Sequence, residues 1–320
     1  MPHVETVRGP VDVAALGTTL MHEHVFILNE EIRRNYPDSW NETTRVRQAI
    51  TKLTALTRRG AQTIADPTVL GLGRDIHRIR RIAAATTLNI IVATGLYTYS
   101  QLPFYFNHRH PGTDGIDPMT EMFVKDITTG IANTPVKAAF LKCAIDKQGM
   151  TPGVERVMRA VCQAHRQTGA PITVHTHPQS ETGLLVLKVL REEGADLAKV
   201  VLGHSGDSTD LNYLATLADA GCLLGMDRFG MDMVISFEQR VDTVAALCAR
   251  GYAGSMVLSH DASCDLDWYE PEPISAVAPN WHFEHIFDDV LPALRDRGVA
   301  DSDLETMLVA NPSRYFSAAG

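Results

Sequence analysis

Short apolar runs alternate with longer amphipathic stretches along the whole chain. The runs are rich in Val, Ile, Leu and Ala and are nearly continuous, which is typical of parallel strands that are buried on both faces. Parallel strands are joined by crossover connections, which are usually helices. Eight runs have this character: Thr19–Phe26, Thr63–Val69, Asn89–Tyr97, Lys137–Ile145, Pro171–His177, Lys199–Gly206, Cys222–Phe229 and Ser255–Ala262.

Several stretches between these runs have helical spacing. In the first of them, Val46, Ile50, Leu53 and Leu56 recur at every third or fourth position, and Gly60 follows where a glycine often ends a helix. The stretches predicted as helices in this way, each followed directly by a glycine, are Thr43–Arg59, Val154–Thr168, Thr182–Glu193 and Leu211–Ala220.

The count of β-then-α units indicates the fold. Eight units without a break in composition predict a single (β/α)₈ TIM barrel over residues 1–320. An open, doubly wound sheet is the alternative, and the absence of a GxGxxG motif after the first run weakens it. A barrel predicts that the functional side chains stand at the C-terminal ends of several strands.

Composition narrows the partners and the compartment. The 320 residues include 29 Lys and Arg against 38 Asp and Glu, a net charge of −9, so we expect neither nucleic acid nor a membrane surface as a partner. The N-terminal residues lack the apolar core of a signal peptide, and no run is long enough to cross a bilayer. Five scattered cysteines without a CxxC pair indicate a reducing compartment. These features predict a cytoplasmic protein.

Histidines gather at the ends of the predicted strands. His22 and His24 would share one face of the first strand, with Glu23 on the other face. Two imidazoles on one face are half of a metal site, although two histidines in a polar turn are an equal alternative. His175 and His177 repeat the spacing at the end of the fifth run. His177 is expected to face solvent, and the alternative is a partner that supports a metal ligand.

The fourth, sixth and eighth runs add Lys142, His204 and Asp261. Lys142 lies within an apolar run, where an unpaired ammonium is costly and burial lowers the pKa of a lysine. Its side chain could extend to the strand end, or its neutral amine could take up carbon dioxide as a carbamate. Asp261 directly follows an apolar run, so its carboxylate needs a partner, and His260 beside it would point the opposite way.

Charge decides how many ions such a cluster could hold. Imidazole and carboxylate ligands suit Zn²⁺, Mn²⁺, Co²⁺ or Fe²⁺. Asp261 alone would balance one dication, whereas two would also need a Lys142 carbamate and a bridging hydroxide. Such a site supplies hydroxide at neutral pH. The candidate ligands are His22, His24, Lys142, His175, His204 and Asp261.

The motifs around these positions resemble those of the phosphotriesterase family of the amidohydrolase superfamily, and more closely its phosphotriesterase-like lactonases. The resemblance spans the chain and rests on several motifs in the same order. They are TLMHEH at 19–24, ADPTVLGLGRD at 65–75, LPFYF at 102–106, GHSGD at 203–207, LGMDRFG at 224–230 and LSHD at 258–261.

The resemblance implies a binuclear centre of two divalent ions, with zinc expected and cobalt, manganese or iron as alternatives. It also implies a homodimer. The ligands that it implies are His22, His24 and Asp261 for the more buried ion, His175 and His204 for the exposed ion, and carboxylated Lys142 with a hydroxide as bridges.

Three further positions match the lactonase branch. Tyr97 matches a tyrosine that leans over the metals and orients the lactone, and Arg228 an arginine that contacts that tyrosine. Trp268 matches an aromatic residue that lines the acyl pocket or the dimer contact. The plainer alternatives are a rim aromatic for Tyr97, a surface salt bridge for Arg228 and loop packing for Trp268. The loop Asp265–His285 is expected to cover an apolar tail.

The resemblance implies hydrolysis of small-molecule lactones. The expected substrates are N-acyl homoserine lactones, which would make the protein a quorum-quenching enzyme, and related γ- and δ-lactones. Asp261 would pass the proton of the hydroxide to the leaving alkoxide. Weaker hydrolysis of organophosphate triesters such as paraoxon is also expected, because their tetrahedral phosphorus resembles the lactone intermediate. The alternatives are a primary triesterase, another ester hydrolase, or an inactive metal-stabilised binding protein.

Overall fold

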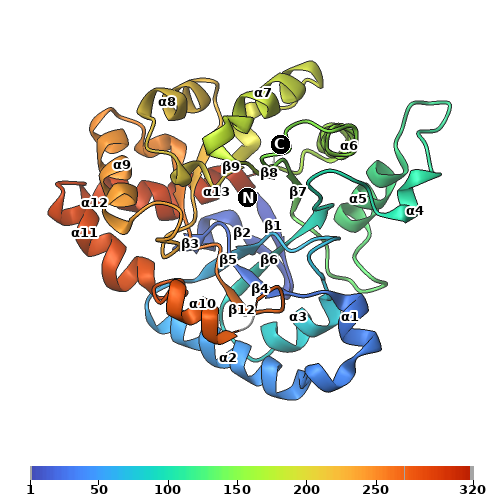
Figure 1. Cartoon of the computed structure of the whole chain (residues 1–320), viewed down its shortest axis with the longest axis horizontal. Coiled ribbons are helices and arrows are strands. Elements are labelled where there is room, and N and C mark those ends of the chain that lie inside the picture. Colours follow the sequence, from blue (N-terminus) through green and yellow to red (C-terminus); the bar gives the residue numbers. More distant parts are fainter. Residues whose placement is uncertain (1, 270, 318–320) are drawn as a thin grey trace.

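A ring of eight parallel strands forms the centre of the protein. The computed structural model describes residues 2–269 and 271–317, and Figure 1 shows the strands enclosed by helices. The barrel strands are β3 (Thr19–Leu20), β5 (Thr63–Asp66), β6 (Asn89–Gly95), β7 (Phe140–Ala144), β8 (Ile172–His175), β9 (Val200–Gly203), β10 (Leu223–Met226) and β11 (Met256–Leu258).

The strands follow one another around the ring in chain order. Every neighbouring pair from β3 to β11 is parallel. The two ends of the sheet meet where the Met21 amide donates to the Leu258 carbonyl over 3.4 Å. A doubly wound sheet would reverse its strand order part-way, so the barrel prediction is confirmed and the open-sheet alternative is wrong.

The helices cover the outside of the ring. The four predicted helices are present, with bounds within two residues of expectation. The helix Pro152–Thr168 ends at Gly169, which has a φ of 70°. The Gly169 amide donates to the His165 carbonyl. The outer helices are α2 (Glu42–Arg58), α3 (Ile76–Ala83), α5 (Pro118–Thr128), α6 (Pro152–Thr168), α7 (Thr182–Glu192), α8 (Leu211–Asp219), α9 (Phe237–Ala249), α11 (Leu291–Asp296), α12 (Asp301–Glu305) and α13 (Asn311–Phe316).

The strands are buried on both faces, which explains their continuous apolar runs. On β6, Ile90 and Val92 belong to the core between strands and helices, whereas Ile91 and Ala93 face the barrel interior. Tyr315 from α13 is also fully buried in the interior core, where its hydroxyl lies 2.9 Å from the Thr173 Oγ1. The interior is therefore packed, and the open space lies at the rim.

The prediction that Thr19–Phe26 is one strand is wrong. Only Thr19–Leu20 joins the barrel, and His24–Ile27 forms a separate strand, β4, paired in parallel with β12 (Ser263–Leu266). The backbone of His22, between them, instead bonds to the turn after β11, through Ser259 Oγ at 2.8 Å and the Asp261 amide at 3.0 Å. His22 and His24 therefore do not lie on one strand. The chain crosses the rim of the barrel between β3 and β4, and this places both imidazole rings at the centre of the rim.

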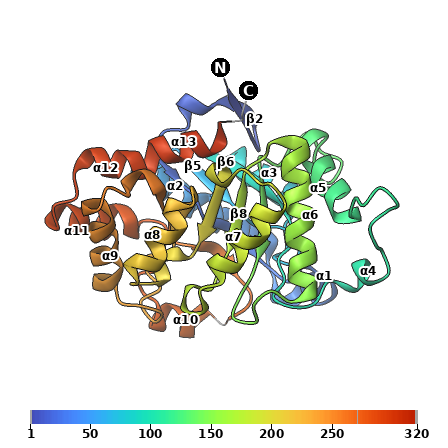
Figure 2. The same ribbon diagram turned by 90° about the horizontal axis from the view of Figure 1, so that it is seen from above.

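The remaining elements lie at the two ends of the barrel. Figure 2 shows the N-terminal hairpin, β1 (His3–Thr6) and β2 (Gly9–Asp12), at the opposite end from α10 (Pro271–Val277). The arm at the right of Figure 1 carries α4 (Phe104–Asn107), and α1 (Glu30–Asn35) follows β4. None of the described helices combines the length and apolar character that crossing a bilayer needs.

Candidate active site

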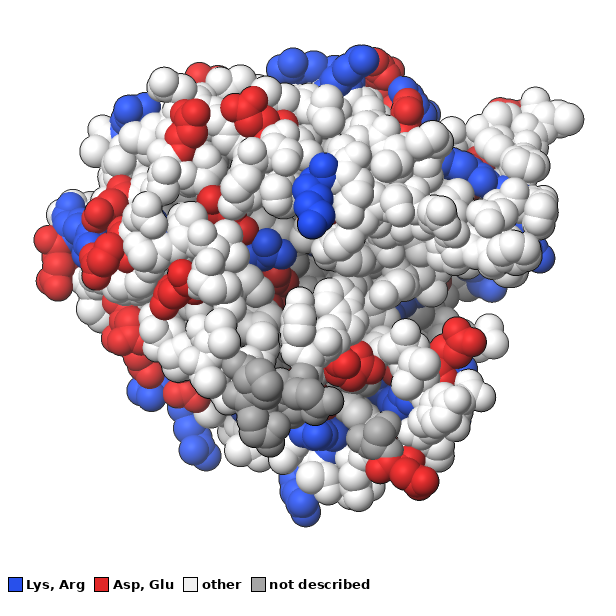
Figure 3. Space-filling view, in the orientation of Figure 1, with Lys and Arg blue, Asp and Glu red and all other residues white. Residues whose placement is uncertain are grey.

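A cavity of about 140 Å³ opens at the C-terminal ends of the strands. Figure 3, which views the face that carries α10, shows a hollow near its centre with charged atoms inside. All six candidate ligands, together with Tyr97, Arg228 and Trp268, line this cavity. The other lining residues are Ile27, Leu72, Tyr99, Met231, Leu266, Tyr269 and Trp281.

His22, His24 and Asp261 form the tightest group of candidate ligands. The Asp261 Oδ1 lies 3.3 Å from the Nε2 of His22 and 3.2 Å from the Nε2 of His24. All three residues are buried. Two imidazole nitrogens and one carboxylate oxygen at this spacing could hold one divalent ion.

His175 and His204 form a second group beside the first. The Nδ1 of His175 lies 2.8 Å from the Nε2 of His204, and both rings are buried. Burial lowers the pKa of both histidines, that of His175 to about 4. Both rings are therefore neutral at neutral pH, which is the form that binds metals.

Lys142 lies beside His22, and its charge also acts on His175. Its side chain is 1% exposed, and its Nζ lies 3.5 Å from the His22 Nε2. Burial lowers its pKa to about 8, although Asp261 opposes this change. A substantial fraction of the amine is therefore neutral near pH 8 and able to take up carbon dioxide. A lysine that reaches solvent at the strand end does not fit this burial.

Asp227, which sequence reasoning missed, orients two of the imidazoles. Its Oδ2 lies 2.8 Å from the His22 Nδ1, and its Oδ1 lies 3.0 Å from the His204 Nδ1 and accepts from the His204 amide at 2.7 Å. Because both Nδ1 atoms face this carboxylate, both Nε2 atoms point into the cavity. Asp227 could itself be a ligand with these histidines, but its oxygens already accept these bonds.

Three other polar residues, Thr68, Asp66 and Asp146, orient the remaining imidazoles. The His24 Nδ1 lies 2.7 Å from the Thr68 hydroxyl, which in turn donates to Asp66. The His175 Nε2 lies 2.9 Å from the Asp146 carboxylate, which leaves Nδ1 directed at the cavity. The signal that could have found the two carboxylates is their position, since Asp66 ends β5 and Asp146 follows β7.

Arg228 joins two carboxylates at the edge of the site. Its Nε donates to the Asp261 Oδ2 at 3.0 Å, and its Nη1 donates to the Asp207 Oδ2 at 3.0 Å. Burial would raise the pKa of Asp261, but His22, His204 and Arg228 hold it well below the usual range. These bonds place Arg228 beside Asp261; its charge also acts on the Tyr97 phenol.

Aromatic side chains form the outer wall. The Tyr97 hydroxyl lies 3.3 Å from the His175 Nδ1 and bonds to the hydroxyl of Tyr99, which sequence reasoning missed. Burial raises the pKa of Tyr97 well above its usual value and that of Tyr99 to about 12. Both phenols are therefore protonated and can donate. The Trp268 ring, 45% exposed, lies 6.3 Å from that of Tyr97.

Two neighbouring histidines lie outside the cavity. His177 is half-buried, and its Nδ1 lies 3.0 Å from the Ser180 hydroxyl oxygen. His260 points away from Asp261, as expected, and its Nδ1 lies 2.5 Å from Glu23. Neither residue is among those that line the cavity.

Comparison with known proteins identifies the family. A profile of the phosphotriesterase family matches residues 2–316. The chain belongs to the phosphotriesterase family. A Mycobacterium tuberculosis protein named phosphotriesterase homology protein is 56% identical over 323 residues, covering 100% of this chain and 99% of that protein. A solved structure described as the phosphotriesterase from M. tuberculosis, also 56% identical, superposes with a TM-score of 0.97 and covers 99% of each chain.

A more distant relative is named for its activity. The aryldialkylphosphatase of Saccharolobus solfataricus is 38% identical over 312 residues, which cover 97% of this chain and 98% of that protein. Membership of the family makes this protein a metal-dependent hydrolase. The predicted resemblance to the family is thus confirmed, and the buried imidazoles and carboxylate are chemically suited to hold its metal.

Proposed function

We propose that this phosphotriesterase-family protein is a lactonase that opens N-acyl homoserine lactones and related γ- and δ-lactones. The observation that carries the proposal is the wall of the cavity, where the Tyr97 hydroxyl stands beside the candidate ligand His175. A protonated phenol there can donate to a carbonyl oxygen. The cavity of about 140 Å³ suits a compact ring with one tail.

We assign two divalent ions to the site, with zinc as the expected metal. Bound there, they would polarise a carbonyl and lower the pKa of a bound water. Lys142 would act as the bridging ligand in its carboxylated form, because it is buried, lies 3.5 Å from the His22 Nε2 and acts electrostatically on His175. The residues that would hold the ions are His22, His24, Lys142, His175, His204 and Asp261.

Protein side chains would carry the proton and orient the ring. Asp261, ionised because its pKa is depressed, would accept the proton of the attacking water and return it to the leaving alkoxide. Arg228 donates to the Asp261 Oδ2, whereas the Nε2 atoms of His22 and His24 lie beside Oδ1. Tyr97 would donate to the lactone carbonyl and hold the ring in place.

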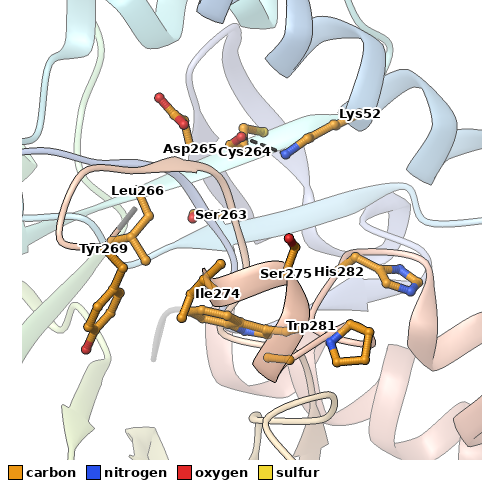
Figure 4. Close-up of a pocket in the computed structure, with 12 residues that line it drawn as sticks. Lys52, Ser263, Cys264, Asp265, Leu266, Tyr269, Ile274, Ser275, Trp281 and His282 are labelled. Atoms are coloured by element: carbon orange, nitrogen blue, oxygen red, sulfur yellow. Dashed lines mark hydrogen bonds between the residues drawn. The ribbon is translucent and has the colours of Figure 1, made fainter. Parts of the chain in front are cut away.

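The acyl tail would leave the site over Trp281. A second cavity of about 460 Å³ shares Leu266, Tyr269 and Trp281 with the first, and α10 contributes Ile274 to it. Figure 4 shows the Trp281 ring beside Ile274, with Lys52 donating to the Cys264 carbonyl at 2.8 Å. An alkyl chain along Trp281 would thus reach a partly apolar space. Trp268, at the outer edge, would line the same path.

The alternative is a primary organophosphate triesterase. The name of the S. solfataricus relative supports it. A triester must bring three substituents to its phosphorus, however, which fits a compact cavity less well than a ring with one tail. We therefore expect triester hydrolysis as the weaker activity. Quorum quenching would follow if acyl homoserine lactones are the substrates in the cell.

We also propose a homodimer. Phe104 and Tyr105 on α4 are 78% and 54% exposed, although large aromatic side chains are usually covered. Sedimentation of the protein with and without Phe104→Glu tests this. A wild-type monomer, or a dimer that tolerates the substitution, would contradict this assignment.

The decisive experiment compares substrates on one preparation. Protein reconstituted with Zn²⁺, Mn²⁺ or Co²⁺ is assayed with acyl homoserine lactones of increasing tail length, by proton release, and with paraoxon and a simple aryl ester. Lactone opening should exceed the other two reactions and stop on chelation. Fully metallated protein without lactone activity would refute the proposal and move the search to triesters, other esters or binding.

A matched variant tests the tail path. Ile274→Trp would fill the second cavity without touching the candidate ligands. We expect kcat/KM to fall for long acyl tails and to stay unchanged for short ones. An equal loss for all tails would place the tail elsewhere.

A further inference from the structure

The carboxylate of Glu23 is buried beside the site but faces away from the candidate ligands. Its Oε1 accepts from the Ser259 hydroxyl at 2.8 Å, from the His260 amide at 2.9 Å and from the His260 ring at 2.5 Å. Its Oε2 accepts from the Ala262 amide at 3.1 Å. The side chains of Glu23 and His260 are both 0% exposed. One carboxylate thus holds four donors from a turn of four residues.

Asp261 is the residue of this turn that Glu23 does not bond. Its φ is 55°, in the left-handed region that residues other than glycine adopt rarely and at a cost. Its amide donates to the His22 carbonyl at 3.0 Å, and its carboxylate faces His22 and His24. The surrounding bonds must hold this conformation, and those made by Glu23 lie on both sides of it.

His260 connects the same turn to the loop over the cavity. The Ile286 amide donates to its Nε2 at 2.9 Å, so the ring proton is on Nδ1 and is given to Glu23. The Trp281 indole donates to the His260 carbonyl at 2.9 Å. Trp281 lines both cavities, and Figure 4 shows it across the larger one.

We infer that Glu23 is a positioning residue for Asp261, and that His260 links the position of Asp261 to the position of Trp281 in the cavity wall. The turn from Ser259 to Ala262 is closed around the Glu23 carboxylate, which directs Asp261 toward His22 and His24. The inference rests on the metal centre of the proposed function. The role also explains why a carboxylate stands between the two histidines of the HxH motif.

The test measures metal binding rather than turnover. Glu23→Gln keeps the shape but replaces one acceptor oxygen with a donor amide, so the bonds to the turn cannot all form. We expect the affinity for Co²⁺, measured in competition with a chromophoric chelator, to fall by about 10- to 100-fold. The visible spectrum of the Co²⁺-loaded variant should also differ from that of the wild type. Unchanged affinity and spectrum, even with a lower melting temperature, would overturn the inference.

Two substitutions of His260 provide a matched pair. An asparagine amide can replace the Nδ1 donor, so His260→Asn should keep the bond to Glu23 and the Co²⁺ affinity. A glutamine oxygen can replace the Nε2 acceptor, so His260→Gln should keep the bond from Ile286 and lose Co²⁺ affinity. The opposite order, or equal affinities, would overturn the inference. The pair also decides the matter if Glu23→Gln does not fold.

Failure of this inference is distinguishable from failure of the proposed function. Co²⁺ binding and its spectrum involve no substrate, so a wild-type protein that binds Co²⁺ without opening lactones refutes only the lactonase. Equal Co²⁺ binding by wild type, Glu23→Gln and His260→Gln refutes only the role of Glu23. A wild-type protein that binds no Co²⁺ refutes both.

Discussion

Asp227→Asn is the sharpest test of how the imidazoles are oriented. The His204 backbone amide can only donate, so the atom 2.7 Å from it must stay an acceptor. Asparagine must then place its amide nitrogen where Oδ2 stood, 2.8 Å from the His22 Nδ1. That nitrogen donates to Nδ1 and drives the ring proton of His22 to Nε2, the nitrogen that faces Asp261 and Lys142.

The expected loss of metal affinity follows from this change of tautomer. His22 would present a proton to the metal, whereas His24, which bonds to Thr68, would be unaffected. Loss of a partner that orients a ligand lowers metal affinity by about 10- to 100-fold, or about 1.4–2.7 kcal/mol. We therefore expect weakened binding of one ion rather than loss of the whole centre.

The assay titrates Zn²⁺ into metal-free protein against a chromophoric chelator. Asp126→Asn is the matched control, because Asp126 accepts from Arg74 and Thr94, each at 2.7 Å, and its side chain is only 17% exposed. It lies on α5, outside the barrel. The control should lower the melting temperature and leave Zn²⁺ affinity unchanged. Asp227→Asn protein that binds Zn²⁺ like the wild type, or a control that loses as much, would refute the reasoning.

Three other predictions concern protons. At fixed dissolved carbon dioxide, reconstitution with metal should become faster as pH rises through about 8, the pKa of Lys142, and also when bicarbonate is added. A wild-type protein that does not respond to bicarbonate would contradict the carbamate, and so would a Lys142→Met variant that does respond. Arg228→Met removes the cation 3.0 Å from Asp261, so the pKa of Asp261 should rise and the acid limb of the kcat/KM profile should move to higher pH; an unmoved limb argues against that contact. Burial lowers the pKa of His175 to about 4, so the folded chain binds fewer protons than the unfolded chain, and the free energy of unfolding of metal-free protein should fall as pH falls from about 6.5 to about 4. Thermal melts measure this, and a melting temperature that rises on acidification would contradict it.

The barrel could be predicted from the sequence because burial on both faces leaves a local signal. Each strand appears as a continuous apolar run, and each of the eight predicted runs contains one barrel strand. The candidate ligands followed from the same logic, since the carboxyl ends of parallel strands meet at one rim. His204 follows β9 directly, and Gly203 before it allows tight packing, since a Cβ there would lie only 3.0 Å from the Val174 carbonyl oxygen.

The bonds that orient these ligands could not be predicted from the sequence. Asp227 and His22 are 205 residues apart, and Glu23 and His260 are 237 apart. No local pattern predicts which buried carboxylate will contact which imidazole, because that depends on how the first and last strands meet when the barrel closes. The break between β3 and β4 has the same origin, since His22 bonds to the turn after β11 instead of continuing a strand.

The sequence by itself therefore determined the barrel and the residue types at its rim, because both follow from local periodicity and from the common direction of parallel strands. Only the tertiary structure decided which nitrogen of each imidazole faces the cavity, that Lys142 is buried beside His22, and that Asp261 adopts a left-handed conformation. The physical reason is that these properties arise from contacts between distant strands, which exist only once the barrel has closed.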